Sequence, residues 1–257
     1  MGAIERVFNI PLTTANERAN TGRIDTAAIT LREPTLTGDN LGLKTWASSY
    51  LLAKRLATLR DELLSPLTGQ HSILELGSGT GLVGLAAALV LKQTVILTDL
   101  PDIVPNIEHN ISCNAALLKD RDAAALSAVL DWSEPSLFLP PTSSSDDGRQ
   151  QPTHSYRLIL AADPIYSPSH PQLLVRAVDA QLSRDADARV VIELPLREAY
   201  LSERQDLVSR LEALGLRMVA QGEEVGYDDW SAGGGGDWDE LEEVRCWWSV
   251  WGWQGAA

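Results

Sequence analysis

Three alternating glycines between a strand-like run and a helical segment constrain the fold of this chain more than any other feature. Glu75-Leu-Gly-Ser-Gly-Thr-Gly81 begins inside the strand-like run 72–76 and precedes the apolar residues 82–91. Glycine permits a tight turn and lets a ligand approach the backbone, and the helix that follows offers free N–H groups at its positive end. A plain strand-to-helix turn needs only one glycine. The spacing therefore predicts a ligand-binding loop.

Alternating β-like and α-like segments surround this loop, from about residue 45 to residue 220. Such alternation is typical of a parallel sheet with helices on both faces. Two final strand-like runs, 216–221 and 244–251, have no helical segment between them, which predicts an antiparallel hairpin at the sheet edge. We expect an α/β, Rossmann-like fold with a seven-stranded, mostly parallel sheet. The other five strands are expected at 72–76, 94–99, 126–130, 157–163 and 189–194.

Residues 1–40 carry strand-like runs at 7–12 and 27–32. We expect them to form a β-rich extension that packs on a main domain of residues 41–257. In one helical segment of that domain, Asn106, Asn110 and Asn114 recur every four residues, so their amides share one face. Residues 133–153 are rich in Pro, Ser, Asp and Gly, which predicts a mobile loop.

Composition narrows the class of protein. The 257 residues are 44% hydrophobic and 22% charged, which suits a globular domain, and no apolar run approaches the about 20 residues that cross a bilayer. The net charge of −14 disfavours nucleic acid as a partner and favours basic partners. The two cysteines and four scattered histidines predict a reducing, cytoplasmic location and no metal site. We also expect a monomer.

The glycine loop alone leaves the ligand open. Gly79-Thr-Gly-Leu-Val-Gly84 fits the dinucleotide pattern G-x-G-x-x-G, and Asp99 lies twenty residues beyond Gly79 at a strand end, where an acid binds ribose hydroxyls. A nicotinamide-dependent oxidoreductase is therefore one reading. S-adenosylmethionine also contains adenosine and would use the same carboxylate.

Three features favour S-adenosylmethionine. Glu75 stands before the first glycine, Gly77, where it could meet the amino group of methionine, a group that a dinucleotide lacks. Asp131-Trp132 places an acceptor and an aromatic ring at a strand end, where adenine would lie. A reductase needs a proton donor, yet the Tyr-x-x-x-Lys spacing at 50–54 precedes the glycine loop instead of following it.

A second motif, Asp163-Pro-Ile-Tyr166, ends the expected strand 157–163. In open α/β sheets, ligands bind beyond the carboxyl ends of the strands. Asp163 could accept hydrogen bonds from an amine, and Tyr166 could line a channel for methyl transfer. Asp-Pro is also common in plain turns, so the motif gains weight only beside the glycine loop.

With these residues assembled, the chain resembles the seven-β-strand protein-lysine methyltransferases of class I fold that carry a D-x-x-Y motif. The resemblance covers most of the chain and rests on residues 42–46, 75–81, 98–100, 131–132 and 163–166. Residues 36–46 and 166–171 are similar to the fungal branch that methylates translation elongation factors.

The resemblance implies a role for each matching residue. Trp46 would flank the cofactor, S-adenosyl-L-methionine, and Ala162 would touch it. Asp99, followed by Leu100, would bind ribose, and Asp163 and Tyr166 would face the acceptor lysine. Adenine would be framed by Asp131 and Trp132. The methionine part would be held by Gly77, Ser78, Gly79, Thr80 and Gly81, with Glu75 beside them. Residues 193–197 match no assignable role.

We therefore expect a protein-lysine N-methyltransferase that acts on a protein substrate, possibly a translation elongation factor. The alternatives are an NAD(P)-dependent oxidoreductase, a non-catalytic S-adenosylmethionine-binding protein and a methyltransferase of small molecules. Residues 227–243 carry seven acids, two tryptophans and four consecutive glycines. We expect this segment to join the last two strands and to help dock a basic substrate surface; a solvated loop is the plainer reading.

Overall fold

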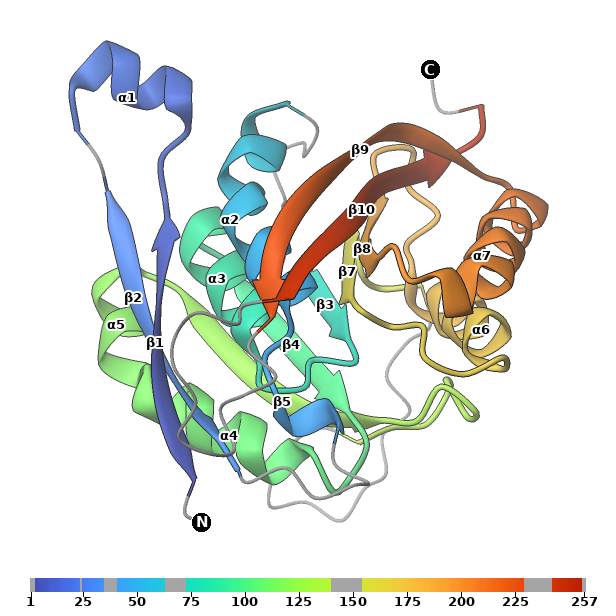
Figure 1. Ribbon diagram of the computed structural model, residues 1–257, viewed down its shortest axis with the longest axis horizontal. Helices are drawn as coiled ribbons and strands as arrows, with labels where there is room; N and C mark the ends of the chain where they lie inside the picture. Colours follow the sequence, from blue (N-terminus) through green and yellow to red (C-terminus); the bar gives the residue numbers. More distant parts are fainter. Residues whose placement is uncertain are drawn as a thin grey trace.

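Residues 3–23, 25–34, 41–62, 73–139, 154–228 and 242–255 are described by the structure, a computed structural model. A central sheet of eight strands has the order β6-β5-β4-β3-β7-β8-β10-β9 (Figure 1). Its strands are β3 (Ile73–Leu76), β4 (Thr94–Asp99), β5 (Ala124–Leu130), β6 (Phe138–Leu139), β7 (Leu158–Ala162), β8 (Arg189–Pro195), β9 (Leu216–Asp228) and β10 (Glu242–Trp253). Without the two-residue β6, these are the seven strands that the sequence predicts.

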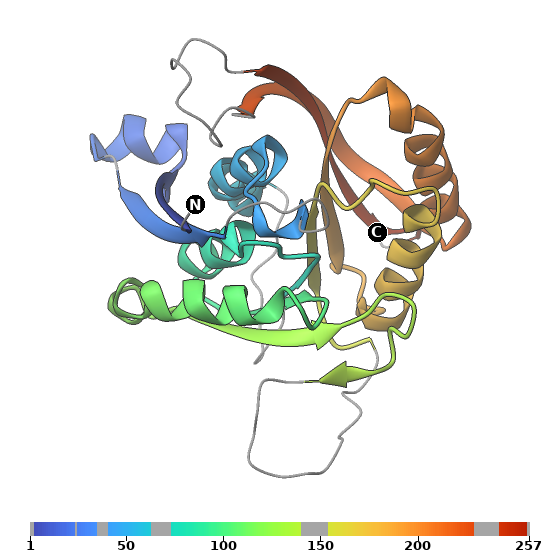
Figure 2. The same cartoon turned by 60° about the horizontal axis from the view of Figure 1, so that its bottom comes forward.

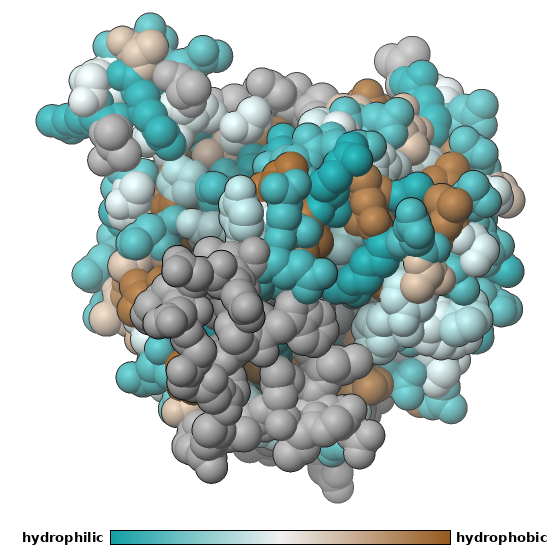
Figure 3. All heavy atoms as spheres, viewed as in Figure 1, coloured by the Kyte–Doolittle hydropathy of each residue, from teal (hydrophilic) through white to brown (hydrophobic). Residues whose placement is uncertain are grey.

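Five neighbouring strands, β5, β4, β3, β7 and β8, run parallel. β10 pairs antiparallel with β8 on one side and with β9 on the other, so β9 is the edge strand. The expected α/β class and the C-terminal antiparallel hairpin are confirmed. Figure 3 shows the face over these two strands as mostly hydrophilic, which suits an exposed sheet edge because a long apolar edge would promote aggregation.

Helices cover both faces of the sheet (Figure 2). One face carries α2 (Ala47–Glu62), α3 (Leu82–Leu91), α4 (Val104–Cys113) and α5 (Ala115–Asp120), and the other carries α6 (His170–Gln181) and α7 (Leu201–Ala213). The 3-10 turn η1 (Leu41–Leu43) precedes α2, and η2 (Glu198–Tyr200) precedes α7. The parallel strands are apolar on both sides because two hydrophobic cores form, one under each helix layer.

The N-terminal segment forms a separate antiparallel sheet of β1 (Ile4–Pro11) and β2 (Thr26–Glu33), joined by α1 (Ala15–Thr21). Ile10, Ile29 and Leu31 are fully buried and belong to the core under α2 and α3. The short α1 begins with a capping box, in which Thr14 and Glu17 exchange hydrogen bonds between side chain and backbone.

A ladder of asparagine amides joins α4 to β2. Asn110 accepts a hydrogen bond from the Arg32 N–H (2.8 Å), and Asn114, which follows α4, accepts one from the Thr30 N–H (3.0 Å). Asn106 donates to the carbonyl of Arg32 (3.2 Å). The three amides therefore share one face, as predicted, and they hydrogen-bond to backbone groups along the edge of β2 that β1 does not pair with. This ladder also reaches the ligand loop, because Asn110 donates to the carbonyl of Thr80 (2.9 Å).

Several predicted features fall on residues outside those that the structure describes. They are residues 35–40, most of the loop at 133–153 and the glycine-rich centre of the acidic segment, 229–241. Among the described residues, no helix combines the length and the apolar character that a membrane crossing requires.

Candidate active site

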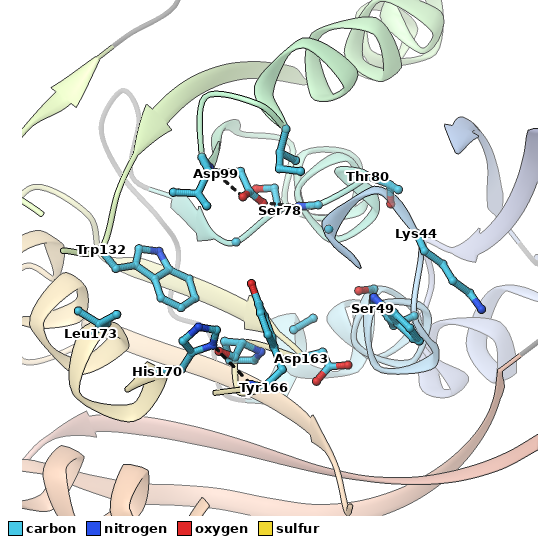
Figure 4. Close-up of a pocket in the computed structure, with 18 of the residues that line it drawn as sticks. Lys44, Ser49, Ser78, Thr80, Asp99, Trp132, Asp163, Tyr166, His170 and Leu173 are labelled. Carbon is cyan, nitrogen blue, oxygen red and sulfur yellow. Dashed lines mark hydrogen bonds between the residues drawn. The ribbon is translucent and has the colours of Figure 1, made fainter. Parts of the chain in front are cut away.

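A cavity of about 630 Å³ lies at the carboxyl ends of the parallel strands (Figure 4). Asp99 and Ser78 stand on one side of it, and Trp132, His170 and Tyr166 stand across from them. Twelve of the predicted site residues line the cavity: Trp46, Gly77, Ser78, Gly79, Thr80, Asp99, Leu100, Asp131, Trp132, Ala162, Asp163 and Tyr166. The fold therefore gathers residues from five separate stretches of sequence around one space.

The glycine loop after β3 has a backbone that other residues rarely adopt. Gly77 and Gly79 have φ angles of +70° and +56°. A Cβ on Gly79 would stand 2.8 Å from the carbonyl oxygen of Gly42, and one on Gly77 would stand 3.1 Å from the Trp132 ring. Both glycines are needed because the two neighbouring segments close directly on the loop.

Asp99 ends β4 beside this loop. Its carboxylate accepts one hydrogen bond from the Gly79 N–H and another from the Leu100 N–H, each at 2.8 Å. Burial raises the pKa of Asp99, and these two hydrogen bonds lower it. The carboxylate is thereby fixed at the cavity wall, at the position where a strand-end acid binds ribose hydroxyls.

Glu75 and Gly81 do not line the cavity. Glu75 is only 2% exposed, and its carboxylate accepts the Gly84 N–H (3.0 Å) in the first turn of α3. Burial raises its pKa to about 8. The expected contact of Glu75 with a methionine amino group is thus not supported by its position, because the side chain turns under the loop into the helix. Gly81 caps the N-terminus of α3 with a φ of +88°.

Residues 42–46 form a part of the cavity wall that packs directly against the glycine loop. The Thr45 hydroxyl lies 2.7 Å from the Thr80 hydroxyl, and the Thr45 N–H donates to the Glu33 carboxylate (3.0 Å). The Lys44 ammonium lies 4.9 Å from the centre of the Trp46 ring, which lines the cavity. The N-terminal sheet therefore holds the segment that carries Trp46.

Asp228, one of the acids that we expected to dock a substrate, has a structural role instead. It ends β9, is 4% exposed, and accepts the Ala47 N–H (2.8 Å) at the start of α2. A carboxylate at a helix N-terminus is stabilising because free N–H groups and the positive dipole end lie there. Asp228 therefore caps α2 and is withdrawn from any substrate surface.

Asp163 follows β7 with a φ of +49°, a strained backbone for a residue with a side chain. Its carboxylate pairs with both terminal nitrogens of Arg197, at 3.1 and 3.4 Å. Burial raises the pKa of Asp163 to about 6, although the Arg197 guanidinium lowers it. The site thus holds a carboxylate that is poised near neutral pH and is oriented by one cation.

Tyr166 stands half-exposed at the cavity wall, with its ring edge-on to His170 at a centroid distance of 4.2 Å. The Tyr166 N–H donates to His170 Nδ1 (3.4 Å), and the His170 ring also lies edge-on to Trp132 at 6.0 Å. Burial raises the pKa of the Tyr166 hydroxyl and lowers that of His170, so an uncharged aromatic wall separates Asp163 from Trp132.

Comparison with known proteins agrees with this geometry. A profile of the lysine methyltransferase family matches residues 24–205. The protein-lysine N-methyltransferase rrg1 of Schizosaccharomyces pombe is 35% identical over 229 residues, which cover 89% of this chain and 68% of the relative.

The chain belongs to the lysine methyltransferase family.

A second relative, the protein-lysine N-methyltransferase EFM2 of Saccharomyces cerevisiae, is 37% identical over 220 residues; the match covers 80% of this chain and 49% of EFM2. The chain therefore spans about half to two-thirds of the length of these relatives. Among solved structures, an S-adenosylmethionine-dependent methyltransferase of Methanosarcina mazei has the same fold, with a TM-score of 0.51 and 11% identity over 74% of this chain and 95% of the other.

S-adenosylmethionine is the cofactor of this family, and the residues at the cavity fit it. Asp99 offers a fixed carboxylate for the ribose hydroxyls, and Trp132 offers a ring for adenine. Gly77 and Gly79 bring bare backbone to the cavity, where the methionine part could lie. The family match decides against the nicotinamide-dependent oxidoreductase that the glycine spacing alone left open.

The sequence did not identify every residue of the site. Arg197 comes from residues 193–197, which had no assignable role, and Lys44, Ser49, His170, Leu173 and Tyr200 also line the cavity. Arg197 meets Asp163 only because β7 and β8 are neighbours in the sheet. The position of Arg197 in the sequence could have predicted it as a site residue, because residues just beyond the carboxyl end of a parallel strand face the ligand.

Proposed function

We propose that this chain transfers a methyl group from S-adenosylmethionine to a lysine side chain of another protein. The family match supports the reaction class, and the placement of Asp163 and Tyr166 in one wall of the cavity supports an amine as acceptor. That placement is the observation that carries the proposal. A non-catalytic binding protein would have no need for a strained, buried carboxylate at this position.

Bound S-adenosylmethionine supplies an electrophilic methyl group on a positively charged sulfur. Asp99 would hold the ribose, Trp132 and Asp131 would frame adenine, and Ala162 and Trp46 would pack beside the reacting end. The glycine loop would approach the methionine part with its backbone. These roles rest on the shared cavity and on the resemblance to the family.

The acceptor lysine must be neutral to react, whereas a free lysine has a pKa near about 10.4. The carboxylate of Asp163 would accept N–H hydrogen bonds from the amine and orient its lone pair. Tyr166 and His170 would exclude water from one side of the amine. The protein then contributes positioning and electrostatics and forms no covalent bond with the acceptor.

We infer that the substrate is a translation elongation factor, met in the cytoplasm by a single copy of this chain. The resemblance of residues 166–171 to the fungal branch supports the substrate class, and the net charge of −14 favours a basic protein over nucleic acid.

The test is methyl transfer from radiolabelled S-adenosylmethionine into lysates of cells that lack this protein. We expect label in one or a few protein bands, and acid hydrolysis should return it as methyl-lysine. Bacterially produced elongation factors, which carry no prior eukaryotic modification, serve as purified acceptors. Label confined to small molecules, or no label despite cofactor binding, would contradict the proposal.

A further inference from the structure

Arg197 is fixed by its backbone as well as by its ion pair. Its N–H donates to the Pro195 carbonyl (3.0 Å), and its own carbonyl accepts the Tyr200 N–H (3.1 Å). The preceding Leu196 N–H donates to the backbone carbonyl of Arg245 in β10 (2.7 Å). The guanidinium lies 5.6 Å from the centre of the Trp46 ring. Arg197 is thus an anchored part of the cavity wall.

Asp163 is anchored just as firmly. Its N–H donates to the Glu193 carbonyl (2.8 Å), and its side chain is 7% exposed against 32% for that of Arg197. The titratable or charged groups that surround this carboxylate come from β8, β9 and β10, from the loops that follow β7 and β8, and from the segment before α2. They are Lys44, Tyr166, Glu193, Arg197, Asp228 and Cys246.

Two of these neighbours oppose each other at Asp163. The Arg197 guanidinium lowers the pKa of Asp163, and the buried Asp228 carboxylate raises it. Arg197 is the neighbour that makes hydrogen bonds to the Asp163 carboxylate, with a bidentate geometry. Loss of its charge would leave Asp163 with burial and a second carboxylate, both of which favour protonation.

We propose, resting on the lysine methyltransferase activity proposed above, that Arg197 is the positioning residue of this site. It keeps the Asp163 carboxylate ionised and aimed into the cavity, and its positive charge disfavours an acceptor that arrives as an ammonium ion. A lysine side chain beside Asp163 also stands near the guanidinium, so the acceptor releases one proton to water before its lone pair can accept the methyl group.

The charge of Arg197 acts on two titrating groups, the Asp163 carboxyl and the amine of the bound lysine. A neighbouring cation lowers the pKa of both a carboxylic acid and an ammonium group. Removing the charge of Arg197 therefore raises the pKa of Asp163 and that of the bound lysine. Both changes displace activity toward alkaline pH. A residue that only supported the fold would lower activity by the same factor at every pH.

The experiment compares Arg197→Met and Arg197→Lys with the wild-type chain. The titration of the Asp163 carboxyl carbon is followed by NMR in the full chain without acceptor, and kcat and kcat/KM are measured from pH 5.5 to 9.5 on a bacterially produced elongation factor. Arg197→Gln keeps N–H donors without the charge and replaces the Met variant if that variant does not fold. Arg210→Met, which removes an exposed i,i+4 ion pair with Asp206 on α7, is the matched control.

For Arg197→Met we expect the Asp163 titration to move up by about one pH unit or more, and kcat/KM at pH 6.5 to fall about fivefold or more with recovery by pH 9. Arg197→Lys should restore most of the wild-type profile, and Arg210→Met should match the wild type. An Asp163 titration that stays in place in Arg197→Met overturns the proposal. So does a uniform loss of activity without a change in the pH profile. A different outcome is also informative: the wild-type chain methylates no lysine, yet the Asp163 titration still moves in Arg197→Met. That result would contradict the proposed function but would support the coupling between Arg197 and Asp163.

Discussion

Asp99 ends β4 at the cavity wall, where the N–H groups of Gly79 and Leu100 hold its carboxylate at the place proposed for ribose. We predict that Asp99→Ala weakens S-adenosylmethionine binding, since each charge-assisted hydrogen bond to ribose contributes about 1.5–3 kcal/mol. Isothermal titration calorimetry measures the change. Asp102→Ala, an exposed acid three residues along, is the matched control. Equal affinity of Asp99→Ala and the wild type would remove Asp99 from the cofactor site.

Glu75 gives a prediction about stability and pH. Burial raises its pKa from an ordinary value near 4.5 to about 8 in the folded chain. The folded state therefore binds more protons than the unfolded state between these values, and stability falls as pH rises through this window. Glu75→Gln keeps an acceptor for the Gly84 N–H and cannot titrate. Between pH 5 and 8, we expect the wild type to lose on the order of 3 kcal/mol more in the free energy of unfolding than the variant. Urea unfolding at pH 5 and pH 8 measures the free energy of unfolding of both proteins. An equal loss in the wild type and in Glu75→Gln would contradict this prediction.

Residues that act through distant partners could not be predicted. The glycine loop, Asp99 and the Asp163–Tyr166 motif are short patterns whose meaning is local. Arg197 lies 34 residues beyond Asp163, and the two meet because β7 and β8 pair in register. The direction of the Glu75 side chain, toward the Gly84 N–H, likewise depends on how α3 packs over β3, and its contact with the cofactor stays a prediction.

At the scale of elements, the asparagine ladder links the N-terminal sheet to the ligand loop. Asn110 is fully buried and hydrogen-bonds to both Arg32 of β2 and Thr80 of the loop. We predict that Asn110→Ala lowers the free energy of unfolding by about 2–4 kcal/mol, because buried partners lose their hydrogen bonds. Cofactor affinity should fall as well. His109→Ala, an exposed neighbour on α4, is the control. The stability of the two variants is compared by denaturant unfolding. Equal midpoint concentrations for Asn110→Ala and His109→Ala would mean that the ladder adds no stability.

The order of the elements was predictable because short apolar runs of strand length alternate with longer helical segments or with a Pro- and Gly-rich loop from β3 to β8. The lack of a helix between β9 and β10 correctly predicted their antiparallel pairing. The sequence could not show that β10 lies between β8 and β9 in the sheet, or that Asp228 caps α2. These contacts depend on how the C-terminal strands return to β8, with no signal in the neighbouring residues.

For the whole molecule, loops and helices around the central sheet line one cavity, and the N-terminal sheet supports the segment before α2 that forms part of its wall. The β-rich extension holds residues 42–46 through Glu33, so we propose that it belongs to the working enzyme and does not merely decorate it. Residues 229–241 lie outside the described chain, and their role in docking stays a prediction. The acids that remain available for it do not include Asp228.

We propose that Asp163 and Tyr166 serve the acceptor lysine while other residues hold the cofactor. The most direct measurement is intact-protein mass spectrometry of a bacterially produced elongation factor after incubation with S-adenosylmethionine. Wild-type chain, Asp163→Ala and Tyr166→Phe are compared after calorimetry has established their cofactor affinities. We predict methyl additions with the wild type and loss of most of them with both variants, at nearly unchanged cofactor affinity. Normal methylation by both variants, or loss of cofactor binding together with methylation, would contradict this account.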